Sequence, residues 1–182
     1  MKWIKKGLIF CPDGEFPWMQ QYAQVPTPLV LEDRIRIYFT TRGKADINGN
    51  FISNTSFIEV DKNNPKNILY IHNKPVIELG ELGTFDEFGI MPGDLVFEDN
   101  GISMLYTGWS RLNSVPFCTR IGKATSTDGG VSFIKCFKGP FIGLGGSDHL
   151  LINGPFYYKE NEDSVHIFYA SGKQWINDEN KP

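Results

Sequence analysis

The sequence predicts an all-β fold built from repeated hairpins, and three observations support this prediction. Aromatic residues make up 14% of the 182 residues, which suits pleated strands and stacking surfaces better than helices. The 19 glycines and 11 prolines supply frequent turn signals. A strand–turn–strand pattern occurs three times, while no segment shows the apolar period of an amphipathic helix.

The three repeats define the expected inner strands. They begin at Pro28, Asp94 and Pro155, and each has an apolar strand, an acidic or Asn-containing turn and a second apolar strand. The starts are 66 and 61 residues apart, a spacing that suits one four-stranded propeller blade with its loops. We therefore expect inner strands near residues 24–31, 90–97 and 152–158.

This spacing divides the chain into blades of one partial β-propeller domain. The first blade would span about residues 20–80, the second about 84–145, and the start of a third about 148–182. Outer strands are expected at 56–61 and 68–72 in the first blade, and at 121–126 and 131–136 in the second. About two and a half blades cannot close a ring. We expect the chain to be part of a longer protein or to self-associate through open blade edges.

Composition narrows the class of protein. An apolar content of 41% is that of a globular chain, and a net charge of −3 argues against nucleic acid as a partner. The three cysteines, Cys11, Cys118 and Cys136, form no C-x-x-C pattern, so we expect reduced thiols in a cytoplasmic protein. No apolar run has the length of a membrane span. We expect no cofactor and no metal, since paired-histidine spacing and a Gly-rich phosphate loop are both lacking.

One motif carries a structural prediction. The segment 126–133, Ser-Thr-Asp-Gly-Gly-Val-Ser-Phe, fits the Asp-box turn of sialidase-type propellers. Asp128 can accept hydrogen bonds from its own turn, and Gly129 and Gly130 can adopt positive φ. We expect this segment to connect two outer strands and to have no catalytic role.

Five motifs together resemble a known superfamily. They are Ala23–Leu31, Gly83–Pro92, Leu105–Trp109, Ile121–Gly130 and Asn153–Pro155. As a set they resemble the five-bladed β-propellers of glycoside hydrolase families 43, 32, 62 and 68 and of mannoside phosphorylase family 130. The resemblance implies a glycosidase-like or phosphorylase-like protein that acts on or binds a glycan in an axial pocket.

The same resemblance implies catalytic carboxylates at the starts of the inner strands. The matching positions here are Val25, Met91 and Asn153, and none carries a carboxylate. Glycoside cleavage needs one carboxyl group as acid and another as base or nucleophile, and these three side chains supply neither. Two alternatives to an enzyme therefore stay open: a non-catalytic sugar-binding propeller, and a structural or interaction module.

Two carboxylates elsewhere are the candidates for catalysis. Asp86 and Glu87 lie in a Gly-flanked loop before the second blade, where we expect the loop to cover the mouth of the axial pocket. Both could act as acid or base there. The alternative is a solvated turn in which Asp86 bonds to the backbone.

Seven further residues near the blade entries are candidates for binding the ligand. Trp109 could stack on a sugar ring, and arginine side chains could bind hydroxyl groups or a carboxylate, so a cluster of arginines would favour an acidic sugar. Each candidate also has a structural alternative, such as packing of Trp109 between blades. The full set is Gln24, Asp94, Trp109, Arg111, Arg120, His149 and Asn153.

Overall fold

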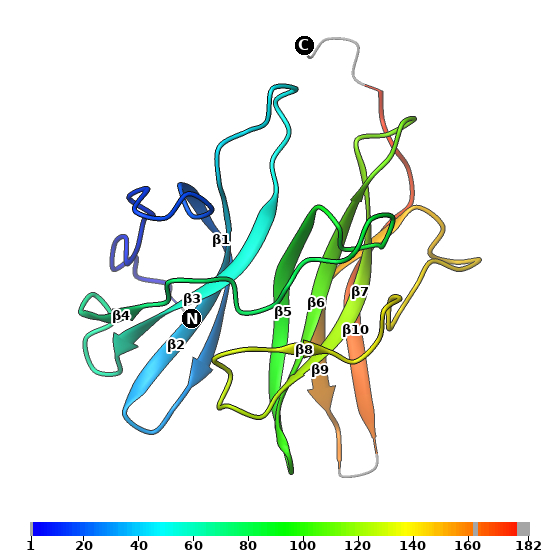
Figure 1. Cartoon of the computed structure of the whole chain (residues 1–182). Helices are drawn as coiled ribbons and strands as arrows, with labels where there is room; N and C mark the ends of the chain where they lie inside the picture. The colour runs from blue at the N-terminus through cyan, green and yellow to red at the C-terminus, as the bar shows by residue number, and fades with distance from the viewer. Residues whose placement is uncertain (1, 162–163, 178–182) are drawn as a thin grey trace.

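The computed structural model describes residues 2–161 and 164–177, and it contains strands and turns without any helix in that part of the chain (Figure 1). No helix capable of crossing a membrane is therefore found among these residues. The strands are β1 (Gln21–Val30), β2 (Arg34–Arg42), β3 (Ser53–Asp61), β4 (Ile68–Ile71), β5 (Gly89–Glu98), β6 (Gly101–Arg111), β7 (Phe117–Ser126), β8 (Ile134–Lys135), β9 (Leu151–Lys159) and β10 (Val165–Gly172).

The strands form two four-stranded blades and a third hairpin. Strands β1 to β4 pair antiparallel in chain order, and so do β5 to β8. A single parallel pair, Ser53 with Gly89, joins the two blades, and β9 pairs with β10 in a separate sheet. The prediction of an all-β fold of propeller blades is confirmed, and β1, β5 and β9 cover the predicted inner strands.

The hydrophobic cores lie on both faces of the first blade because successive strand residues point to opposite faces. Tyr38 and Phe57 of the first blade point toward the second blade. Their chain neighbours, Phe39 and Ile58, point the other way into a second core. The N-terminal segment covers that second core with Phe10, Phe16 and Trp18.

The second blade follows the same rule. Met104 and Tyr106 pack toward the first blade, whereas Leu105 between them packs with Ile121 and Ile152 toward the third hairpin. Both faces of β6 are buried, and seven consecutive residues from Ile102 to Gly108 are inaccessible to solvent. Because alternate side chains of β6 point to opposite faces, this one strand packs against both the first blade and the third hairpin.

The Asp-box turn forms as the sequence predicts. The Asp128 carboxylate accepts hydrogen bonds from the backbone N–H groups of Val131 and Ser132, at 2.9 and 3.0 Å. The Ser126 hydroxyl donates to the same carboxylate at 2.7 Å. Burial raises the pKa of Asp128, but hydrogen bonds from Ser132, Ser126 and Val131 outweigh it and lower this pKa to about 2.

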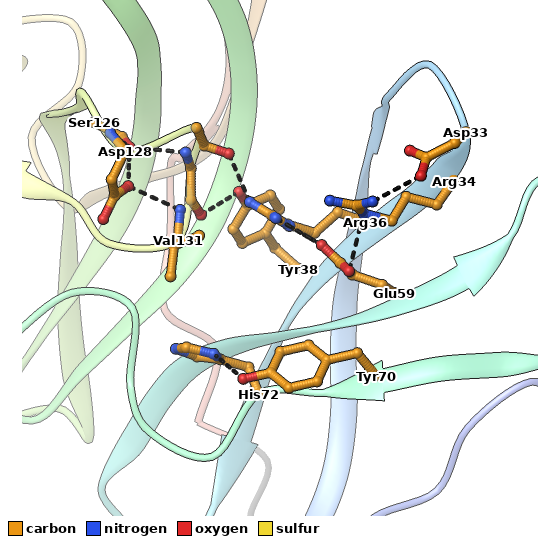
Figure 2. Close-up of polar contacts among 12 residues, drawn as sticks. Asp33, Arg34, Arg36, Tyr38, Glu59, Tyr70, His72, Ser126, Asp128 and Val131 are labelled. Atoms are coloured by element: carbon orange, nitrogen blue, oxygen red, sulfur yellow. Dashed lines mark hydrogen bonds and ion pairs between the residues drawn. The ribbon is translucent and has the colours of Figure 1, made fainter.

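This turn docks on the first blade (Figure 2). The Tyr38 hydroxyl donates to the carbonyl of Gly130, and Arg36 Nη1 donates to the carbonyl of Gly129, both at 2.6 Å. Arg36 also binds Glu59 Oε1 through Nε and Nη2, at 3.0 and 2.6 Å. The positive φ of 83° at Gly130 and a Cβ position only 2.3 Å from the Tyr38 hydroxyl oxygen explain why glycine is needed there.

Two expected outer strands differ in extent from the structure. Strand β8 comprises only Ile134 and Lys135, because Val131 and Ser132 are used in the Asp-box turn. Strand β7 begins at Phe117, four residues before the expected start at 121, so Arg120 lies within a strand. Residues 162–163 of the third hairpin turn and residues 178–182 of the third blade lie outside the described residues.

The third hairpin has one apolar face open to solvent. Phe156, Tyr158 and Phe168 are each more than half exposed, and the rings of Tyr158 and Phe168 are in edge contact. An uncovered face of this kind agrees with the expected open blade edge. Self-association through it stays a prediction.

We predict that Asp128→Ala destabilises the fold by about 1–2 kcal/mol at pH 7, because the turn loses its acceptor. The pKa of Asp128 lies below the ordinary value of 3.8, so its stabilising effect is present above about pH 4 and is lost as pH falls toward 2. That pH-dependent part is only about 1 kcal/mol because the side chain is exposed. Urea unfolding of the parent protein and the variant at pH 7 and pH 3 measures the total loss of stability and its pH-dependent part. The control is Asp99→Ala in an exposed turn. An Asp128 variant with an unchanged pH slope would contradict this assignment.

Candidate functional site

The starts of the inner strands gather at one end of the molecule, which we call the upper end (Figure 1). Strands β1, β5 and β9 begin there, and the loops 43–52 and 112–116 project from the same end. Thr27 Oγ1 donates to the carbonyl of Gly93 at 3.1 Å and connects β1 to β5. The Gly154 N–H donates to Thr107 Oγ1 at 3.1 Å and connects β9 to the second blade.

A depression of about 180 Å³ lies at this end, and we call it the upper depression. It is formed by the ends of β2 and β6, the starts of β3 and β7, the residue just before β5, and two loops. Its lining residues are Arg42, Gly49, Asn50, Phe51, Ser53, Phe88, Trp109, Ser110, Arg111, Pro116 and Phe117. A neighbouring hollow of about 290 Å³ shares Asn50 and Arg111 with it.

Aromatic rings form one wall of the upper depression. The Trp109 indole lies 4.5 Å from the ring of Phe117, which in turn contacts Trp175 edge-on at 5.2 Å. Trp109 is half-buried, yet its Nε1 is inaccessible to solvent and has no hydrogen-bond partner within the described part of the chain. The accessible part of the indole ring at the depression suits contact with the apolar face of a ligand.

Arg42 lies among three of these rings. Its Nε donates to Ser53 Oγ at 3.1 Å. Its guanidinium carbon is 5.5 Å from the ring centres of Tyr22 and Phe51 and 5.9 Å from that of Trp109. These distances are typical of cation–π interactions, and such interactions hold the planar guanidinium of Arg42 in place at the depression.

Arg111, a second cation at the depression, is also held in place by its neighbours. Its guanidinium lies 3.9 Å over the ring of Phe88, and Nη2 donates to the carbonyl of Phe51 at 2.9 Å. Arg120 approaches the depression through a long contact of 3.5 Å between Nη1 and Ser110 Oγ. The structure therefore brings Trp109 and Arg111 together, with Arg120 beside them.

Strand β1 is distorted where it meets this site. Tyr22 and Val25 have φ of 66° and 52°, values rare for residues with a side chain and especially for a β-branched one. The register of β1 against β2 shifts twice, between Gln21 and Gln24 and between Gln24 and Thr27. Such strain concentrates at functional sites, and here the bulged strand presents the Tyr22 ring to Arg42.

The three axial positions carry no proton-transferring group. Val25 is 41% exposed on the distorted part of β1, and Met91 is half-buried on β5. Asn153 is half-buried on β9 opposite Ala170. Gln24 is exposed opposite Thr40. None of Gln24, Asn153 and Arg120 lines the upper depression or the hollow beside it.

Asp86 lies elsewhere, although we expected it above the axial pocket. It is 1% exposed and lines a separate cavity of about 410 Å³, the lateral cavity, between the segment 77–86 and β8. Its Oδ2 accepts hydrogen bonds from Tyr106 at 3.0 Å and pairs with Lys135 Nζ at 2.6 Å. Its Oδ1 accepts from Thr84 at 3.1 Å. Burial and the adjacent Asp86 carboxylate raise the pKa of Tyr106 well above its usual range.

The remaining candidates make local contacts. Glu87 accepts from the Gly83 N–H at 2.8 Å within its own turn. Asp94 accepts from the Tyr157 N–H at 2.9 Å and so bridges the second blade to the third hairpin. His149 is exposed. Its neighbour Asp148 accepts from the Tyr169 hydroxyl at 3.0 Å.

Metal binding has no support in the described residues, where no group of three His, Cys, Asp or Glu side chains could hold an ion. Four residues at the site were not predicted from the sequence: Arg42, Tyr22, Phe51 and Phe88. A signal for Arg42 does exist: it ends the second strand of the first hairpin, just as Arg111 ends that of the second.

Two curated relatives match almost the whole chain. Both are uncharacterized proteins of Mycobacterium tuberculosis, from two strains, and each is 31% identical over 176 residues. The match covers 96% of this chain but only 56% of each relative, so the chain spans little more than half of their length. No family model matches the chain.

Solved structures with similar folds include glycoside hydrolases and a sucrose-6-phosphate hydrolase. A family 117 glycoside hydrolase of Zobellia galactanivorans aligns with a TM-score of 0.58 and 17% identity, over 82% of this chain and 43% of that one. A sucrose-6-phosphate hydrolase of Lactobacillus gasseri aligns at 0.59 and 14%, over 80% and 27%. A thermostable family 43 glycoside hydrolase aligns at 0.52 and 17%, over 81% and 41%. These similarities show the propeller fold that the sequence predicts.

We predict that Asp86→Asn destabilises the protein by about 2–4 kcal/mol, because it leaves Lys135 without its carboxylate in a largely buried setting. The double variant Asp86→Asn, Lys135→Met should recover part of this loss, since the unpaired charge is then removed. Denaturant unfolding of both variants gives the comparison, with Glu87→Gln in the same loop as control. Equal stability of Asp86→Asn and the parent protein would contradict a structural ion pair.

Proposed function

We propose that this chain binds carbohydrate at the upper depression. The observation that supports the proposal most directly is the half-buried Trp109 ring, which lines the depression together with the guanidinium groups of Arg42 and Arg111. A pyranose has an apolar face for an aromatic ring and hydroxyl groups for guanidinium donors. The propeller fold of the glycoside hydrolase structures adds support at the level of fold alone.

The size and position of the depression fit this role. Its volume of about 180 Å³ is below the ~300–1,000 Å³ of pockets for drug-sized ligands, which suits one sugar unit more than an extended chain. It lies at the same end of the molecule as the starts of the inner strands, although no residue of β1, β5 or β9 lines it. Binding without cleavage is the simplest function, because Val25, Met91 and Asn153 provide no acid or base.

Catalysis is the second candidate function, and the lateral cavity favours it. A buried carboxylate paired with a lysine and a tyrosine is an arrangement found in active sites as well as in structural ion pairs. Asp86 would be the acid or base, with Glu87 next to it in the chain. The lateral cavity is larger than the upper depression, at about 410 Å³.

A cytoplasmic location remains part of the proposal. All three cysteines are free, with Cys11 and Cys136 exposed and Cys118 buried. Free, exposed thiols are typical of a reducing compartment.

We predict that Trp109→Ala weakens glycan binding about tenfold or more, which corresponds to about 1.4 kcal/mol, because the stacking surface is lost. An array of neutral and acidic oligosaccharides identifies a ligand, and calorimetry then gives its affinity for each variant. Trp109→Phe keeps a ring and should lose less. Phe97→Ala, an exposed aromatic residue near the opposite end of β5, is the control. Unchanged affinity of Trp109→Ala would count against the site.

For the catalytic candidate, we predict that Asp86→Asn abolishes turnover of any substrate that the parent protein cleaves, while affinity changes by less than about tenfold. The assay is run well below the melting temperature of the variant. If Asp86→Asn retains turnover, Asp86 is not the acid or base. If the parent protein cleaves none of its ligands, binding alone remains.

A further inference from the structure

The arginines of the chain fall into two groups. Arg34 and Arg36 form ion pairs with carboxylates, Arg36 with Glu59 at 2.6 Å and Arg34 with Glu59 at 2.9 Å. The other three, Arg42, Arg111 and Arg120, have no carboxylate within 4.0 Å in the part of the chain that the structure describes. All three lie at or beside the upper depression. Positive charge is therefore concentrated there, although the chain as a whole carries −3.

Two of these guanidinium groups are held in place without using all their donors. A guanidinium has five N–H donors. Arg42 uses Nε for Ser53, and Arg111 uses Nη2 for the Phe51 carbonyl. Aromatic rings fix both groups, so a ligand would meet a preorganised pair of cations. Little side-chain entropy would then be lost on binding.

A carboxylate at the neighbouring hollow, that of Asp46, only partly offsets this charge. Asp46 lines the neighbouring hollow together with Lys44 and Arg111. Its Oδ1 accepts from the backbone N–H groups of Asn48 and Asn50, both at 2.9 Å, so it is committed to the turn of its loop. The cations Arg42, Arg111 and Lys44 therefore outnumber the one anion.

We propose that the carbohydrate bound at the upper depression is anionic, and that its carboxylate, sulfate or phosphate group is bound by Arg42 and Arg111. The inference rests on the proposed function and names the class of its ligand. An ion pair between a guanidinium and an oxyanion supplies charge-assisted hydrogen bonds, while Trp109 receives the sugar ring. A neutral sugar would leave these cations unpaired and would bind more weakly.

The test compares sugars that differ only in charge. Calorimetry with the full chain at low salt measures glucose, glucuronate, glucose 6-sulfate and glucose 6-phosphate, with galactose and galacturonate as a second series. We expect at least one anionic sugar to bind about tenfold or more tightly than its neutral parent, and added salt to reduce that difference. Comparison of glucuronate with glucose 6-sulfate and glucose 6-phosphate shows which oxyanion the site prefers.

Variants assign the preference to the two arginines. Arg42→Gln and Arg111→Gln should each reduce the anionic preference, the ratio of anionic to neutral affinity, to about threefold or less, and the neutral sugar measured on the same variant corrects for loss of hydroxyl contacts. Arg42→Lys and Arg111→Lys keep the charge and should retain part of it, which separates a charge effect from loss of packing. Lys138→Gln, an equal change of charge at the lateral cavity, is the control.

Three results would overturn the inference. If neutral and anionic sugars bind equally, the anionic ligand class is wrong while sugar binding stands. If sodium sulfate or phosphate alone binds as tightly as the anionic sugar, the site recognises an ion and not a sugar. If none of these sugars binds, both the ligand class and the proposed sugar site are rejected.

Discussion

The contact on which the rest of the structure depends is the docking of the Asp-box turn against the first blade. Arg36 and Tyr38 project from β2 and donate to two successive carbonyl groups of that turn. Tyr38 also belongs to the core shared by both blades, so one side chain provides apolar contact and a directional hydrogen bond. Burial raises the pKa of Tyr38 to about 12, which keeps its hydroxyl protonated as a donor. Hydrophobic packing alone is non-directional, whereas these bonds determine how one blade is placed against the next.

This placement determines what meets at the upper end. Because the blades are held at a defined distance, the side chain of Thr27 reaches the backbone of β5, and Arg111 of the second blade reaches the Phe51 carbonyl of the first. The strained conformations of Tyr22 and Val25 persist because the surrounding sheet over-determines them. The upper depression is therefore a product of the blade interface, and its walls come from segments of both blades that lie far apart in the chain.

The side chains that a glycosidase would need at one site lie in two separate cavities here. Cations and aromatic rings lie in the upper depression, whereas the buried carboxylate lies in the lateral cavity with Lys135, Tyr106 and Thr84 around it. Glycoside cleavage requires carboxyl groups on both sides of one bond, about 5–10 Å apart. An arrangement with arginines and an indole at the ends of β2 and β6, and no carboxylate at the three axial positions, is better suited to holding a sugar than to breaking its linkage.

The sequence by itself determined the inner strands and the Asp-box turn, though not the extent of β7 and β8, because alternation of apolar residues and turn chemistry act over a few neighbouring residues. It also placed Trp109 and Arg111 among the candidates. Only the tertiary structure decided that Asp86 is buried against Tyr106 and Lys135, and that Arg42, Tyr22 and Phe51 join Trp109. Those contacts link residues as far apart as Arg42 and Trp109. Such pairings depend on how blades pack, which no local pattern in the chain encodes.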